Sequence, residues 1–173
     1  DAGVNAAPNR VFVANFNAQT SQLSDIVDIM LNEPFDSPLK PLDGIENINW
    51  STDCNLIAYT CKKLEGKAYA LSTNSDIYIY NISTKQTSNI SEFNKGYDRN
   101  PVFSNNGNFI AWESMQNDGY ESDKNRLVVY DLKNPESIYI SDKIDQNFHH
   151  LVWKSDDSKI YFYSPYIGTE QLF

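Results

Sequence analysis

The stretch Asn100-Pro-Val-Phe-Ser-Asn-Asn-Gly-Asn-Phe-Ile-Ala-Trp112 decides the fold, because the chain contains it in three versions. An earlier version reads Ile48-Asn-Trp-Ser-Thr-Asp-Cys-Asn-Leu-Ile-Ala-Tyr59, and a later one reads Leu151-Val-Trp-Lys-Ser-Asp-Asp-Ser-Lys-Ile-Tyr-Phe162. The versions share an aromatic column, an Asp or Asn column and an Ile column: Trp50, Phe103 and Trp153; Asp53, Asn106 and Asp156; Ile57, Ile110 and Ile160. An apolar strand end, a polar turn and a second apolar strand predict a β-hairpin. Because the aromatic residues are spaced 53 and 50 residues apart, the hairpin indicates a repeat architecture.

The composition is that of one globular domain rich in β-structure. With 173 residues, 40% of them hydrophobic, the chain is long enough to bury a core. Eleven Tyr, nine Phe and three Trp against seven Gly favour strands. A net charge of −9 without a basic stripe argues against nucleic-acid binding. No apolar run approaches the roughly 18 residues of a membrane span.

The residue pattern predicts a series of short strands around these hairpins. They are expected at Val11–Phe16, Asp25–Leu31, 45–51, Asn55–Cys61, Asp76–Ile82, Thr87–Ser91, 99–104, 108–114, Arg126–Leu132 and Ser137–Ser141. Prolines make Ser37–Leu42 at best an edge strand. A third hairpin follows Gln146, and its third strand should begin at Thr169. We expect Trp50 and Phe103 to be equivalent and buried.

Each complete unit is four antiparallel strands in about 50 residues, which is the size of a propeller blade. The predicted fold class is therefore all-β, a partial β-propeller of about three four-stranded antiparallel blades. We expect residues 1–10 to be a flexible tail and the blade pieces to be 11–42, 45–92, 93–141 and 145–173. Since a ring closes with 4–8 blades, the pieces make part of a ring. Self-association through open blade faces is then expected.

The longest connections are the candidate functional surface. The second connection of each unit is long, at 62–75 and 115–124, whereas the first and third are tight, so the long loops share one face. The later loop gathers acids and an aromatic residue, and the earlier one carries Tyr69. Two interpretations remain open: a solvated acidic loop, or a surface that meets a substrate or another domain. The candidate residues are Glu113, Asp118, Tyr120, Glu121 and Tyr69.

Catalytic, metal and cofactor chemistry is not expected in this chain. No Gly-X-Ser-X-Gly motif occurs, so no serine nucleophile with a base is recognisable. The only histidines, His149 and His150, are adjacent in a predicted strand. Alternation would place them on opposite faces, which favours structural or solvated roles over a metal site. The pair Asp156-Asp157 occupies a hairpin turn, so turn chemistry explains it.

The two cysteines do not form a disulfide framework or a metal-binding spacing. Cys54 lies in a predicted turn and Cys61 in a predicted strand. We expect unpaired structural thiols, with a disulfide across the hairpin as the alternative.

The repeated stretches resemble the WD40-like repeat whose usual form is Phe/Trp-Ser-Pro-Asp-Gly-Lys-X-Ile-Ala-Tyr. That repeat occurs in Tol-type periplasmic propellers and in the N-terminal propellers of the prolyl oligopeptidase family. The connecting segments Tyr69–Tyr78, Gly96–Ser104 and Asp118–Leu127 are similar to bacterial dipeptidyl-peptidase and acylaminoacyl-peptidase propellers. The turn departs from the consensus, since its Pro is replaced in all three copies and its Gly survives only as Gly107.

This resemblance implies a serine peptidase, a hydrolase whose α/β-hydrolase domain follows a propeller that restricts access to oligopeptides. The chain would then be the non-catalytic propeller part that gates and presents peptide substrate, in an exported or periplasmic bacterial protein. One branch of dipeptidyl peptidases holds the substrate's amino terminus with adjacent glutamates, and the chain has no Glu-Glu pair. The alternative is a Tol-type propeller that binds protein partners and carries no enzyme.

Overall fold

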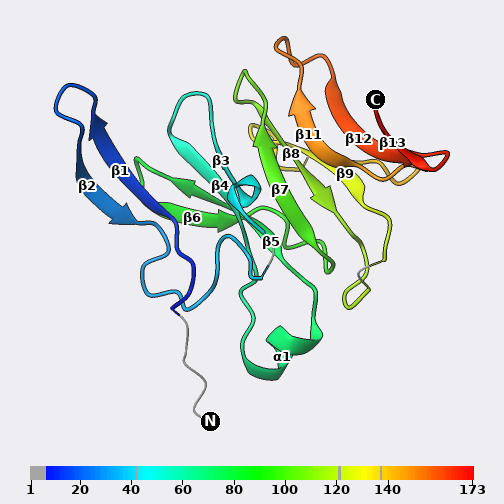
Figure 1. The fold of residues 1–173 in the computed structure, drawn as a ribbon, viewed down its shortest axis with the longest axis horizontal. Coiled ribbons are helices and arrows are strands. Elements are labelled where there is room, and N and C mark those ends of the chain that lie inside the picture. Colours follow the sequence, from blue (N-terminus) through cyan, green and yellow to red (C-terminus); the bar gives the residue numbers. More distant parts are fainter. Residues whose placement is uncertain (1–6, 42, 121, 137) are drawn as a thin grey trace.

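The computed structural model describes residues 7–41, 43–120, 122–136 and 138–173, and these form four antiparallel sheets (Figure 1). The sheets have the orders β1-β2, β3-β4-β5-β6, β7-β8-β9-β10 and β11-β12-β13. The first two contain β1 (Phe12–Asn17), β2 (Gln22–Asp28), β3 (Ile48–Trp50), β4 (Leu56–Cys61), β5 (Asp76–Asn81) and β6 (Gln86–Asn89). The others contain β7 (Asp98–Phe103), β8 (Phe109–Ser114), β9 (Arg126–Asp131), β10 (Ile138–Ile140), β11 (His149–Trp153), β12 (Ile160–Tyr166) and β13 (Thr169–Leu172). The predicted fold of sequential antiparallel strands is confirmed.

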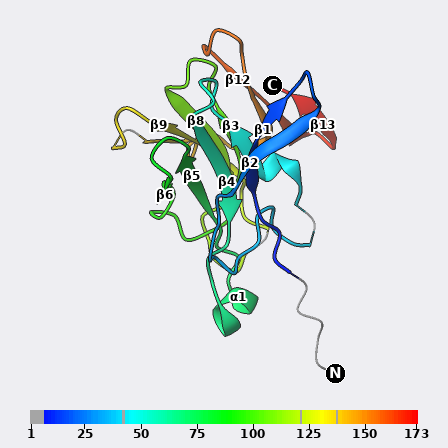
Figure 2. The ribbon, with the colours of Figure 1, turned by 90° about the vertical axis from the view of Figure 1, so that its left-hand side faces the viewer.

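The sheets follow one another from left to right in Figure 1, in the order of the chain. In Figure 2 the second sheet shows β6, β5, β4 and β3 from left to right, so β3 and β6 are its two edges. The tight turns after β3, β7 and β11 are at the top of Figure 1. The β4–β5 and β8–β9 connections are at the bottom, so the long loops do share one end.

Helices are short in the described part of the chain. They are the 3-10 helix η1 (Ile45–Asn47) and α1 (Gly66–Leu71). Neither is long and apolar enough to cross a membrane.

The core consists of three apolar clusters, one in each space between neighbouring sheets. Strand β4 shows how the sequence builds them. Ile57, Tyr59 and Cys61 point into the cluster shared with the first sheet, whereas Ala58 points into the cluster shared with the third. Because a neighbouring sheet covers each face, β4 is apolar at almost every position.

The aromatic column is not uniformly buried. Phe103 is 8% exposed, as predicted, but Trp50 is 47% exposed, so that prediction was wrong. Phe103 belongs to the apolar cluster between the second and third sheets. The neighbouring sheet also decides how far the two tryptophans of the column are covered. Phe109 of β8 stacks on Trp153 with ring centroids 6.3 Å apart, whereas no described ring contacts Trp50. In β3 it is Ile48 that packs against the cluster shared with the first sheet.

Several predicted boundaries differ from the structure. The expected strand 45–51 begins as η1, and α1 occupies part of the polar connection 62–75. The possible edge strand Ser37–Leu42 is irregular as far as it is described, and Leu42 and Ser137 lie outside the described residues. In the last sheet β12 turns directly into β13 at Ile167-Gly168, without a long second connection.

The turns of neighbouring sheets are hydrogen bonded to each other. The Asp157 carboxylate accepts hydrogen bonds from the backbone N–H groups of Asn105 and Asn106, both at 2.8 Å. On the other side of that turn, Thr52 Oγ1 donates to the Ser104 carbonyl at 3.4 Å. Asp157 has a φ of 57°, which confirms the turn interpretation of the Asp pair. Its carboxylate also joins two sheets.

A buried polar cluster fixes the linker between β6 and β7. The Asn94 amide donates to Asp98 Oδ1 at 3.0 Å and accepts from an Arg126 nitrogen at 3.3 Å. Asp98 is 0% exposed, and its Oδ2 has no hydrogen-bond partner. Burial raises the pKa of Asp98 to about 7, although hydrogen bonds from Ser114, Ser91 and Asn94 act against it. The linker is tight at Gly96, where a Cβ atom would lie 2.2 Å from the Met115 carbonyl oxygen.

Both cysteines are unpaired, as expected. Cys54 is exposed in the turn and Cys61 is buried in β4, where burial raises its thiol pKa to about 12.

Candidate functional site

The predicted site residues separate into two places. Asp118, Tyr120 and Tyr69 belong to the two long loops, as expected, whereas Glu121 lies outside the described residues. Glu113 does not belong to the loop surface. It is in β8 and is 1% exposed, because alternation along the strand turns its side chain between the third and fourth sheets.

Asp118 links the two long loops by hydrogen bonds. Its Oδ1 accepts hydrogen bonds from Ser72 Oγ and from the backbone N–H of Thr73, both at 2.7 Å. In return, the backbone N–H of Gly119 donates to Thr73 Oγ1 at 2.8 Å. The hydrogen bond from Ser72 is the main reason that the pKa of Asp118 is lowered. The loops therefore form one rim at the lower end of Figure 1.

The rim presents apolar and aromatic side chains to solvent. Tyr120 is 58% exposed and Leu71, at the end of α1, is 67% exposed. Tyr69 lies in α1, partly buried, with Lys62 Nζ 4.5 Å from its ring centroid. Burial is the main reason that the pKa of Tyr69 is raised. Tyr120 and Leu71 thus give the rim a solvent-exposed apolar part.

Buried Glu113 is the centre of a second, unpredicted cluster. Its Oε1 accepts hydrogen bonds from the Asn100 amide at 3.1 Å and from the backbone N–H of His150 at 3.0 Å. Its Oε2 accepts from the Asn125 amide at 2.8 Å and lies 3.4 Å from His149 Nδ1. Burial opposes ionisation, but these hydrogen bonds hold the pKa of Glu113 below its usual value.

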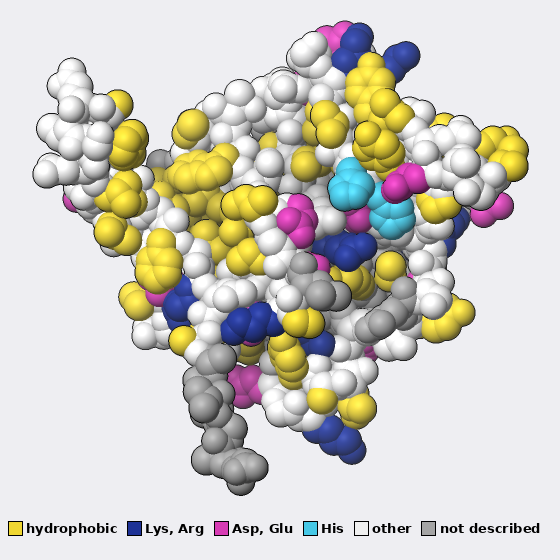
Figure 3. All heavy atoms as spheres, in the orientation of Figure 1, with side chains coloured by type: hydrophobic (Ala, Val, Ile, Leu, Met, Phe, Trp, Pro, Cys, Tyr) yellow, Lys and Arg dark blue, Asp and Glu magenta, His cyan; other side chains and the backbone are white. Residues whose placement is uncertain are grey.

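Two β-bulges shape this cluster. Pairing shifts register between Arg99 and Val102 in β7 and between His149 and Val152 in β11. Asn100 and His150 both have positive φ, 55° and 53°, at equivalent repeat positions. The bulge breaks the alternation expected for the two histidines. Figure 3 shows both histidine side chains on the same face of the molecule, with acidic and basic side chains around them.

The sequence contained a signal for this cluster that the hairpin alignment did not use. Asn47, Asn100 and His150 each stand three residues before the aromatic column. The structure links the first two, since Asn47 Nδ2 donates to Asn100 Oδ1 at 3.0 Å. A polar residue that recurs at one repeat position before an apolar stretch is a sign of a buried polar network.

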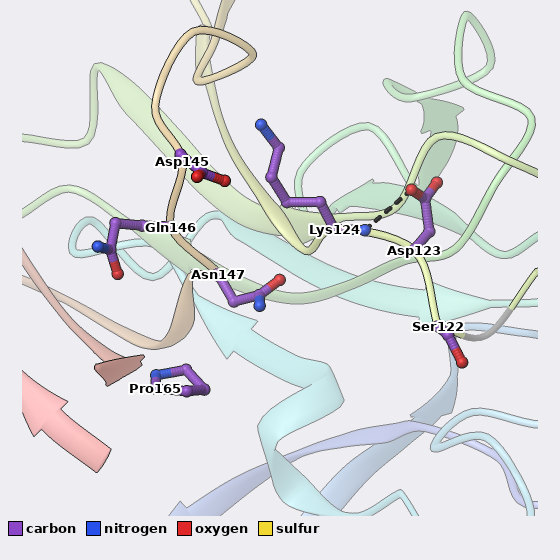
Figure 4. A pocket seen from close by; sticks show the side chains of 7 residues that line it. All are labelled: Ser122, Asp123, Lys124, Asp145, Gln146, Asn147 and Pro165. Carbon is purple, nitrogen blue, oxygen red and sulfur yellow. Dashed lines mark hydrogen bonds between the residues drawn. The ribbon is translucent and has the colours of Figure 1, made fainter. Parts of the chain in front are cut away.

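A polar pocket of about 290 Å³ lies beside the start of β9 and is drawn in Figure 4. It is lined by Ser122, Asp123, Lys124, Asp145, Gln146, Asn147 and Pro165. Most of its polar groups are already engaged. Asp123 accepts from the backbone N–H groups of Gln116 and Asn117, and Asn147 accepts from that of Asn125. The described residues contain no cluster of His, Cys, Asp and Glu that fits a metal ion.

This fold is that of part of a β-propeller. The TolB structure from Acinetobacter baumannii matches 95% of the chain with a TM-score of 0.58 at 14% identity, over 37% of that protein. The tricorn protease matches 88% with a TM-score of 0.54 at 13% identity, over 13% of that chain. A putative TolB from Agrobacterium tumefaciens matches 89% with a TM-score of 0.53 at 12% identity, over 50% of its length.

In sequence the chain is similar to peptidases. It is 47% identical to the dipeptidyl-peptidase 5 of Porphyromonas gingivalis over 151 residues, which are 87% of this chain and 22% of that protein. It is 25% identical to the dipeptidyl-peptidase 5 of Schizosaccharomyces pombe over 150 residues, 85% of this chain and 21% of that protein. The chain thus spans about a fifth of the length of the curated relatives it matches. No family model matches it.

Proposed function

We propose that this chain is propeller structure of a serine dipeptidyl-peptidase and is non-catalytic by itself. The similarity to the Porphyromonas gingivalis dipeptidyl-peptidase 5, at 47% identity over most of the chain, carries the proposal. In the prolyl oligopeptidase family that this implies, the reaction belongs to an α/β-hydrolase domain. The role of this part is to gate and present peptide substrate to that domain.

The four sheets are the proposed blades, with pieces 11–42, 45–92, 93–141 and 145–173. The sequential antiparallel order within each sheet and the apolar cluster between each pair of sheets support this assignment. The rim formed by the two long loops is the proposed contact surface for substrate or for the hydrolase domain. Its support is the exposure of Tyr120 and Leu71 next to the Asp118 hydrogen bonds.

The coding sequence that follows codon 173 tests the peptidase assignment. A Gly-X-Ser-X-Gly motif in an α/β-hydrolase pattern some hundreds of codons downstream supports it. Kinetics of the full-length product then test the rim. Replacing Tyr120 by Ala should change KM for longer peptides more than for a chromogenic dipeptide substrate, whereas equal effects on both would contradict gating.

A Tol-type propeller that binds protein partners is the second candidate. The match to the Acinetobacter baumannii TolB, with a TM-score of 0.58, favours it. An open reading frame that closes the ring and stops without a hydrolase pattern would establish this alternative and reject the peptidase assignment.

Self-association of the chain with a second copy is a further part of the proposal. Apolar side chains are exposed on the first sheet, including Phe16 and Ile26, and on the last sheet, including Tyr161 and Leu172. Sedimentation velocity at micromolar concentration tests it, and a monomer at all concentrations would contradict it.

A further inference from the structure

Two partly exposed side chains, one of them a histidine on the face seen in Figure 3, flank one oxygen of buried Glu113. Arg99 Nε lies 3.6 Å and His149 Nδ1 lies 3.4 Å from Glu113 Oε2. The Arg99 and His149 side chains are 25% and 28% exposed, whereas that of Glu113 is 1% exposed. The carboxylate therefore holds a basic side chain from β7 and an imidazole from β11 next to each other at the surface.

The hydrogen bonds around Asn125 favour one tautomer of His149. The Asn125 amide donates to Glu113 Oε2 at 2.8 Å and to the Phe148 carbonyl at 2.7 Å, which uses both of its hydrogens. Although His149 Nδ1 lies 3.1 Å from the same nitrogen, it receives no hydrogen there. This arrangement favours the tautomer that carries its proton on Nδ1, 3.4 Å from Glu113 Oε2. The other ring nitrogen, Nε2, is left as a hydrogen-bond acceptor.

Arg99 supplies the matching donor. Its Nε is buried without a hydrogen-bond partner, so the outer guanidinium nitrogens are the donors that a ligand can meet, and the guanidinium carbon lies 5.0 Å from the ring centroid of Tyr97. Tyr97 is held by Asp43, whose Oδ2 accepts from the tyrosine hydroxyl at 3.1 Å. Stacking and the Glu113 charge restrain the guanidinium, so little conformational entropy remains to be lost when it donates to a ligand.

We infer that Arg99 and His149 form a binding site for the main chain of an extended peptide. In an extended strand, the C=O and N–H of one residue point to the same side. The guanidinium donates to the carbonyl, and the bare Nε2 of His149 accepts from the amide N–H. Such a pair contacts the peptide backbone and not the peptide side chains, which suits a protein that binds peptides of varied sequence. The choice of a peptide as the ligand rests on the proposed function.

The surroundings agree with a neutral main-chain ligand. The negative charges of Glu113, next to Arg99, and of Asp43, beyond Tyr97, offset the positive charge of Arg99. The site therefore lacks the net positive charge that would attract a free anion. The ring of Tyr163 is 42% exposed and meets the His150 ring edge-on, with centroids 5.9 Å apart. It offers an apolar surface for a peptide side chain beside the backbone contacts.

Nitrogen NMR of the histidine side chains tests the site in the intact chain at pH 8. The free protein should show His149 with a protonated Nδ1 and a bare Nε2. The probe is N-acetyl-trialanine amide, which has no charged terminus. It should shift the His149 Nε2 resonance, and its analogue N-methylated at all three alanines should bind more weakly.

Substitutions locate the binding. His149→Phe and Arg99→Met should each weaken peptide binding roughly two- to tenfold, the loss of one hydrogen bond. Glu136→Ala, an exposed residue of the β9–β10 turn, is the matched control and should bind as the parent chain does.

Three results would overturn the inference. A proton on Nε2 of the free histidine would remove the acceptor. No shift with peptide would reject the ligand, and a shift with sodium phosphate or acetate alone would make this an anion site. These outcomes are separate from the coding-sequence test, since peptide binding can succeed or fail whichever domain follows the chain.

Discussion

Replacing Asp98 by asparagine should make the stability of the fold less sensitive to pH. The folded carboxyl has a pKa of about 7 instead of its usual 3.8, because it is buried and its own Oδ2 has no hydrogen-bond partner. Between these two values the folded state holds a proton that the unfolded state has released. The parent chain therefore loses stability as pH rises through this window, and the loss is complete above pH 7. At 1.36 kcal/mol per pH unit it reaches about 4 kcal/mol, of which about 3 kcal/mol falls between pH 5 and pH 8.

Urea unfolding followed by tryptophan fluorescence at pH 5, 6, 7 and 8 measures this effect. The free energy of unfolding of D98N, relative to the parent chain, should rise by about 3 kcal/mol from pH 5 to pH 8. Asp145→Asn, which changes an exposed carboxyl without a hydrogen bond to the protein, is the control and should show no such rise. A difference between D98N and the parent that is constant with pH would refute the reasoning, because it would mean that Asp98 is ionised throughout.

Other substitutions test other parts of the fold. Glu113→Ala should destabilise the chain by about 3–5 kcal/mol in urea unfolding, because it leaves buried donors unpaired, whereas Glu136→Ala should change little. Ile110→Ala should cost about 2–5 kcal/mol for its cavity, and a loss under 1 kcal/mol would contradict close packing there. Iodoacetamide should label Cys54 in the folded chain and Cys61 only after unfolding, as peptide mass spectrometry can show. The purified chain should not hydrolyse chromogenic dipeptide substrates, and hydrolysis blocked by a serine-directed inhibitor would disprove this.

The strands could be predicted because their signal is local. The columns that end in Ile57, Ile110 and Ile160 place an apolar strand after each polar turn, and the structure has β4, β8 and β12 there. Turn residues and β-branched residues favour turns and strands within a few positions of the chain. The strands could therefore be predicted without knowing which residues of other sheets pack against them.

The environment of a strand was harder to predict, because it depends on what the next sheet offers. Trp50 and Trp153 share a column, yet only Trp153 has a Phe109 to stack on. Glu113 was grouped with the exposed loop because acids follow it in sequence, although it lies within the predicted strand 108–114, and β8 does extend to Ser114. The positive φ of His150 reversed the assumption that adjacent strand residues face opposite ways, and periodicity alone cannot reveal a bulge.

The hydrogen bonds between neighbouring turns bear on how similar units avoid mistaken association during folding. Asp157 accepts from two backbone N–H groups of its neighbour, whereas the corresponding junction one unit earlier uses the Thr52 hydroxyl and a carbonyl. Units of like shape are prone to exchange places or to dock out of order. Because each junction has its own donors and acceptors, a unit that skipped its proper neighbour would leave these polar groups unmatched. The correct sequence of units is thus favoured by chemistry at their edges, even where their strands and turns are nearly alike.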